Sequence, residues 1–122
     1  MGWATDADVE IGIGIDILYD RHLVVDEEAV NTDKGVQTVY QLSAAGAVIP
    51  ATMNASVYLD GRHIAVLDHR SETSDACFIH DPTDNIMSAR VNCKTGRLII
   101  NWHNRVKAGQ TKVVMTYEYL KG

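Results

Sequence analysis

The 122-residue sequence lacks a run of about 20 apolar residues, the length that a membrane-spanning helix requires. It has only two cysteines, Cys77 and Cys93, which are too few for a disulfide framework. Its first ten residues, MGWATDADVE, have neither the basic nor the apolar region of a secretory signal. We therefore expect a protein without a membrane partner, whose two thiols stay reduced.

Basic charge is also scarce, because 11 Lys and Arg residues face 16 Asp and Glu residues, a net charge of −5. Non-specific binding to nucleic acid requires a basic surface, so we expect no nucleic-acid partner. The remaining composition, 46% hydrophobic and 22% charged, is typical of one globular domain that can bury its own core.

Alternation with a period of two dominates the sequence. From Val9 to Tyr19 every odd position is apolar, whereas Gly12 and Gly14 leave the second face nearly bare. The segments Val36–Leu42 and Thr111–Leu120 alternate too, and no segment keeps a helical period for three turns. This pattern predicts strands. The two glycines predict either a bend or a close approach of another backbone.

Two hairpins are predicted from turn residues that lie between alternating runs. The first turns at Asp60-Gly61, a pair typical of a two-residue type I′ turn. The second turns at Lys94–Gly96. After this turn Leu98, Ile100 and Trp102 are in phase, which predicts that all three are buried.

Short strands with turn signals every 8–12 residues or so predict an all-β fold, an antiparallel β-sandwich or a small β-barrel. We expect residues 1–35 to form an N-terminal arm and long first strand, a candidate inter-subunit element, and residues 36–122 to form a compact β-sandwich module. Within the arm, a short strand at Leu23–Val25 and one helical turn at Asp26–Asn31 are predicted. The segment Ser43–Pro50 is predicted to be an irregular connection.

No catalytic pattern is present in the sequence. The five histidines lack metal-ligand spacing, and Asp68, His69 and His80 are the best candidate trio. The favoured interpretation is that the histidines are polar surface residues. Neither cysteine lies in a nucleophile motif, and Cys93 is predicted to pack in the core with Val91. We therefore expect no enzymatic activity, no cofactor and no bound metal.

The aromatic residues allow two interpretations. Trp3, Trp102, Tyr58, Tyr117 and Tyr119 could form a sugar-stacking platform, but such residues more often fill a core or an interface. Trp3 lies in a polar arm without a local core, so we expect it to anchor on a partner subunit. The candidate interface residues are Trp3, Val9, Ile11, Gly12, Ile13 and Gly14.

Three stretches, in this order and spacing, resemble a β-rich module of tailed-bacteriophage structural proteins. They are LSAAGAVIPATMNASVYLDG (Leu42–Gly61), RVNCKTGRLIINW (Arg90–Trp102) and VKAGQTKVVMTYEYL (Val106–Leu120). The chain departs from the family pattern where Ala51 replaces the usual glycine after proline, and where Asn92-Cys93 replaces Asp-Tyr.

The resemblance implies a non-enzymatic structural protein that is assembled into a virion in the host cytoplasm. The module occurs in head decoration, neck, tail and baseplate proteins. The small size of this chain favours, by analogy, a capsid decoration (cement) protein that stabilises the head shell. Its implied partner is the major capsid protein or another virion protein, and its implied state is a homotrimer at local three-fold positions. The alternatives are a neck, tail or baseplate component, or a β-sandwich that binds host glycans.

Overall fold

The computed structural model describes residues 20–44 and 46–121, and this part of the chain is all-β, without a helix. Consequently, the described residues include no helix long and apolar enough to cross a membrane. The strands are β2 (Asp20–Val30), β3 (Gly35–Gln41), β4 (Asn54–Leu59), β5 (Arg62–Asp68), β6 (Phe78–His80), β7 (Ile86–Asn92), β8 (Arg97–Val106) and β9 (Thr111–Lys121).

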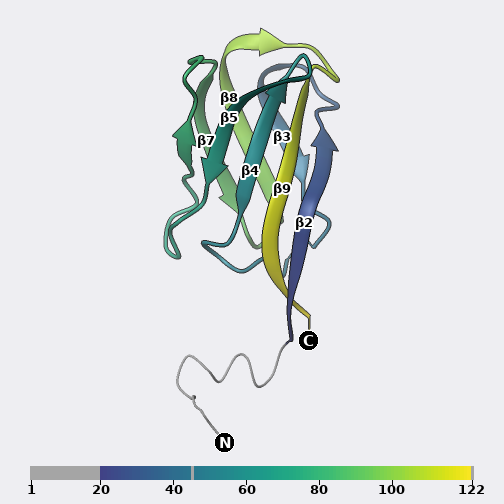
Figure 1. Cartoon of the computed structure of the whole chain (residues 1–122), viewed down its shortest axis with the longest axis vertical. Helices are drawn as coiled ribbons and strands as arrows, with labels where there is room; N and C mark the ends of the chain where they lie inside the picture. Colours follow the sequence, from purple (N-terminus) through teal and green to yellow (C-terminus); the bar gives the residue numbers. More distant parts are fainter. Residues whose placement is uncertain (1–19, 45, 122) are drawn as a thin grey trace, which may run out of the picture.

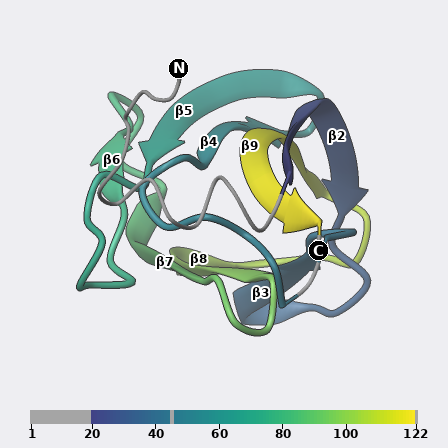
Figure 2. The ribbon, with the colours of Figure 1, turned by 90° about the horizontal axis from the view of Figure 1, so that it is seen from below.

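The strands form two antiparallel sheets that pack face to face (Figure 1). The larger sheet has the order β2-β9-β4-β5-β6, and the smaller has the order β3-β8-β7. Seen from below, the larger sheet curves over the smaller one, with β2 toward β3 and β6 toward β7 (Figure 2). The predicted all-β, antiparallel sandwich is therefore confirmed.

Both predicted hairpins are confirmed. Asp60 and Gly61 have φ angles of 52° and 79°, as a type I′ turn requires. In the second hairpin the N–H of Gly96 donates to the carbonyl of Asn92 at 2.7 Å. The Asn92 side chain accepts from the N–H groups of Lys94 and Thr95. These backbone donors therefore find their hydrogen-bond acceptor within the turn itself.

The predicted helical turn at Asp26–Asn31 is wrong, because β2 continues through this segment to Val30. A β-bulge accommodates the acidic residues. Asp26 takes a left-handed φ of 56°, and its N–H donates to Oγ1 of Thr116 on β9. The tertiary ladder with β9 thus overrides the local preference, and β2, which belongs to the range 1–35, pairs along its length with a strand of the module.

The core lies between the sheets and confirms the predicted burial of Leu98, Ile100 and Trp102. These side chains of β8 meet inward-facing side chains of the larger sheet. The buried hydrophobic residues are Tyr40, Leu42, Val48, Met53, Ala55, Val57, Ile64, Ala65, Leu67, Ile86, Ala89, Val91, Leu98, Ile100, Trp102, Val106, Val113, Met115 and Tyr117.

A chain of buried hydrogen bonds joins the two sheets within this core. The indole Nε1 of Trp102 donates to Thr38, whose hydroxyl donates to Tyr40, both at 2.9 Å. The hydroxyls of Tyr40 and Thr111 are 2.5 Å apart, and Thr111 donates to Oδ1 of Asn31 at 2.8 Å. An indole N–H can only donate and a carbonyl oxygen can only accept, so each hydroxyl in the chain donates toward Asn31.

Candidate interaction edge

All six interface residues predicted from the sequence, Trp3, Val9, Ile11, Gly12, Ile13 and Gly14, lie outside the described residues. The segment that contains them leads directly into β2. The nearest described element to the predicted interface is β2. This strand forms one edge of the larger sheet.

The outer edge of β2 pairs with no other strand in the described part of the chain. β2 has 11 residues, and β9 occupies only one of its two hydrogen-bonding sides. An edge of this length presents unpaired N–H and C=O groups that can template another strand. On the opposite margin of the same sheet, β6 has only three residues. β2 therefore offers a longer edge for pairing with another strand than β6 does.

Exposed apolar side chains are concentrated on β2. Leu23, Val25 and Val30 are 63%, 58% and 50% exposed, and no other described strand carries three large hydrophobic side chains at this level. Val36 and Val39 on the neighbouring strand β3 are exposed as well. Scattered exposed apolar residues are ordinary, but a group along an unpaired strand edge is typical of an interaction site.

The inward-facing side of β2 is fixed to the body of the sandwich. The carboxylate of Glu27 accepts from the backbone N–H of Ser43 at 2.9 Å and from its hydroxyl at 2.6 Å. It also accepts from the hydroxyl of Tyr117 at 2.8 Å. Burial, together with the nearby Glu27 carboxylate, raises the pKa of Tyr117. These bonds hold the edge rigidly in place, which lowers the entropy lost on binding a partner strand.

His22 also lies on the inward side of β2. Its ring stacks on Tyr119 with centroids 5.2 Å apart. Its Nε2 atom is buried and has no hydrogen-bond partner among the described residues. The ring therefore contributes packing rather than a complete polar contact.

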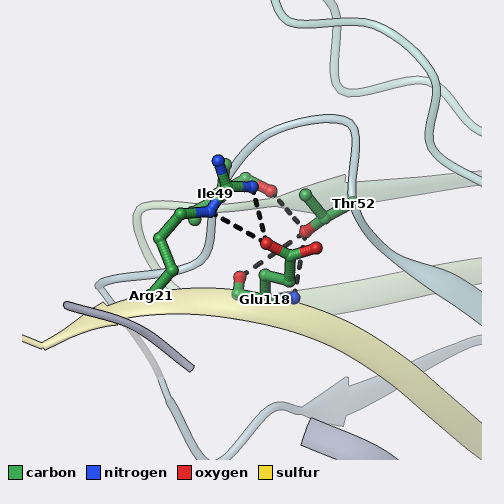
Figure 3. A network of polar contacts seen from close by, with 4 residues as sticks. All are labelled: Arg21, Ile49, Thr52 and Glu118. Atoms are coloured by element: carbon green, nitrogen blue, oxygen red, sulfur yellow. Dashed lines mark hydrogen bonds and ion pairs between the residues drawn. The ribbon is translucent and has the colours of Figure 1, made fainter. Parts of the chain in front are cut away.

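A polar network fixes the beginning of β2 and the connection before β4 to β9 (Figure 3). Nε and Nη2 of Arg21 donate to Oε1 of Glu118 at 2.9 and 2.5 Å. Thr52 donates to the carbonyl of Ile49 and accepts from the N–H of Glu118. The N–H of Ile49 in turn donates to the carbonyl of Glu118 at 2.9 Å. The ion pair is exposed and contributes at most about 1 kcal/mol, so the backbone bonds do most of the anchoring.

The candidate metal trio is not assembled into a ligand cluster within the described ranges. Asp68 accepts hydrogen bonds from Arg70 at 2.7 Å and from Asn54 at 2.5 Å. The bonds from Arg70 and Asn54 lower the pKa of this carboxyl group. His80 lies exposed on β6. Each of these side chains therefore has a different environment.

The predicted surface position of His69 is wrong, because its side chain is buried, with 3% exposed. Its Nδ1 accepts from the N–H of Ala51 at 3.1 Å, so Nε2 carries the proton that is donated to the carbonyl of Ser74 at 2.6 Å. The ring thus ties the loop after β5 to the connection before β4. No sequence spacing signals this role, since both partners are backbone groups.

The aromatic residues do not form a sugar-stacking platform in the described structure. Trp102 is buried, as the phase of its strand predicted, and Tyr117 is buried as well. Tyr58 is half-buried, with the Lys112 amine 5.0 Å from its ring centroid and the His63 ring 5.2 Å away. Trp3 lies outside the described residues.

The two cysteines are free and half-buried, and both pack against the core, as predicted for Cys93. Burial raises the pKa of Cys93, and burial with nearby Asp75 raises the pKa of Cys77 to about 12. Both thiols therefore stay protonated near neutral pH and are poor nucleophiles.

No protein-family model matches this chain, and no curated protein matches it. The candidate site consequently rests on geometry alone. It consists of the unpaired edge of β2 with its exposed apolar side chains. The sequence pattern indicated the adjoining segment as an interface but did not indicate this edge. The signal was the run Leu23-Val24-Val25, because three consecutive apolar residues in a strand must direct at least one side chain outward.

Proposed function

We propose that this protein is a non-enzymatic structural protein of a tailed-bacteriophage virion. In this proposal it is a capsid decoration (cement) protein that binds the major capsid protein as a homotrimer and stabilises the head shell. The observation that carries the proposal is the long, rigidly held and apolar edge of β2 on a compact sandwich. Such an edge joins subunits by main-chain hydrogen bonds without requiring a cleft.

The turn geometry supports the resemblance on which the phage assignment rests. The residue after Pro50 is usually glycine in the family, and here Ala51 adopts a left-handed φ of 70°. This conformation favours glycine. Gly96 and Gly109, in the second and third matching stretches, also have positive φ angles, of 68° and 78°. The usual glycine position of the family after Pro50 thus coincides with a position where this backbone takes the conformation that glycine favours, and a glycine takes it in each of the other two matching stretches.

Immunogold electron microscopy of purified virions of the source phage tests the proposal. An antibody against this protein should label the outer surface of the heads. Heads from which the protein has been stripped should break at a lower temperature, and adding the protein back should restore their stability. Gold on the neck, tail or baseplate would replace the decoration role with one of those positions. Virions without any label would refute the virion assignment altogether.

A further inference from the structure

We infer that the outer edge of β2 from Asp20 to Val25 accepts residues 12–17 of a second copy of this chain as an added antiparallel strand. The inference rests on the oligomer in the proposed function, but not on the capsid. It names the donor, the acceptor and the register of the contact between subunits.

The acceptor stretch has two distinct faces and a defined end. Arg21 and Leu23 face outward, because their partners on β9 lie on its outer face, whereas His22 and Val24 face inward. The bulge interrupts the regular ladder after Val24, so the stretch available for regular pairing ends at the bulge, at Val25. Six residues match the common length of a strand.

The donor stretch has two faces that complement the acceptor. Ile11, Ile13 and Ile15 share one face of the alternating pattern, and the other face carries Gly12 and Gly14. With the isoleucines inward, they extend the apolar inner face of the larger sheet beyond Val24. The bare glycine face then lies outward, where it leaves room for the large exposed side chains of the acceptor.

In one antiparallel register the two faces of the donor match the two faces of the acceptor, and an oppositely charged pair forms as well. This register places Ile13 opposite Val24 and Gly14 opposite Leu23. The same register places Asp16 opposite Arg21, an opposite-charge pair. A slip of one residue would turn every isoleucine outward. A slip of two residues in one direction would place Asp16 opposite Leu23, which removes the charge pairing.

The donor must come from another copy, because the same chain lacks a suitable turn. β2 already pairs with β9 from Asp20 onward. A hairpin within one chain would have to reverse direction across Ile17, Leu18 and Tyr19, which include no glycine, asparagine or proline. Tight turns depend on those residue types. Exchange between copies is head-to-tail, and such a contact closes into a ring if the rotation per subunit permits, as in a trimer.

Complementation between two full-length variants tests the inference by light scattering after size-exclusion chromatography. The acceptor variant carries Leu23→Lys and Val25→Lys, and the donor variant carries Ile13→Lys and Ile15→Lys. Each variant alone should have the mass of one chain. An equimolar mixture should contain a species with the mass of two chains, because one intact donor and one intact acceptor remain.

A matched control carries Phe78→Lys and Met87→Lys, which are similarly exposed apolar positions remote from β2 in the pairing order. It should keep the mass of the parent oligomer, and every variant should remain folded, with a cooperative unfolding transition. A monomeric parent would overturn the inference. Oligomers that survive in either variant, or a mixture that stays monomeric, would overturn it too.

Disulfide cross-linking tests the register. A copy with Gly14→Cys mixed with a copy with Leu23→Cys should give a linked dimer, identified by mass spectrometry of the joined peptides. Gly12→Cys replaces Gly14→Cys in the control, since position 12 lies opposite Leu23 only in an antiparallel strand slipped by two residues or in a parallel strand. Absence of this linked dimer, or preferential linkage through position 12, would refute the proposed register. Head labelling by a strictly monomeric protein would separate this failure from failure of the proposed function.

Discussion

Tyr40→Phe should destabilise the fold through the buried hydrogen-bond chain. Tyr40 accepts from Thr38 and donates to Thr111, and all three side chains are essentially buried. Removing the phenol oxygen leaves the Thr38 hydroxyl without its acceptor, while Thr111 still donates to Asn31. An unsatisfied buried donor costs about 1–3 kcal/mol. At roughly 4 °C per kcal/mol for a domain of this size, the Tm should fall by roughly 4–12 °C.

Urea unfolding measures this loss as a change in the free energy of unfolding at constant slope. Tyr119→Phe is the matched control, because Tyr119 is half-buried and its hydroxyl takes part in none of these bonds. Its effect should stay within about 0.5 kcal/mol. The double variant Thr38→Val with Tyr40→Phe should cost less than the sum of the single variants, since the orphaned donor is gone. Equal stability of the Tyr40→Phe and Tyr119→Phe proteins would refute the reasoning.

The other predictions concern backbone conformation, loop anchoring and titration. Ala51→Gly should stabilise the fold by about 0.5 kcal/mol, because relief of the left-handed alanine outweighs the added entropy of the unfolded chain; a lower Tm in calorimetry would contradict this. His69→Ala should speed amide deuterium exchange in residues 70–77, since it removes both bonds that anchor this loop; unchanged protection would show that the ring is dispensable. With its pKa raised to about 12, Cys77 should resist iodoacetamide at pH 8 until the protein is unfolded; rapid labelling of the native protein would rule out a protonated thiol. Burial raises the pKa of Tyr40, so the folded state keeps this proton at a pH where the unfolded state loses it, and stability should fall as pH rises above about 10. Tyr40→Phe should lose less stability over that range in alkaline urea titrations, and an equal loss would assign the effect to other groups.

Local chemistry explains which parts of the fold were predictable from the sequence. The turn at Asp60-Gly61 needs positive φ angles that only a few residue types adopt, and the alternation of Leu98, Ile100 and Trp102 records a buried face. Both features depend on neighbours in the sequence. The antiparallel sandwich follows from several such signals together.

Long-range contacts explain what the sequence did not reveal. Residues Asp26–Asn31 have no strong strand pattern of their own, and β9 imposes the extended conformation on this segment through the ladder and the bulge. His69 is buried because two backbone groups from separate loops need a partner. For the candidate site, the sequence indicated the N-terminal segment, but the unpaired edge of β2 depends on the order of strands in the sheet.

The interior position of β9 in the larger sheet has a consequence for synthesis on the ribosome. β9 lies between β2 and β4, although its residues 111–121 follow both strands by more than 50 positions in the chain. Until residues 111–121 emerge, neither β2 nor the β9-facing side of β4 has its native neighbour. The nascent chain therefore exposes pairing-competent strands until β9 has been synthesised, a state prone to aggregation. Because these pairings join segments far apart in the sequence, the larger sheet should fold slowly and only after β9 has emerged.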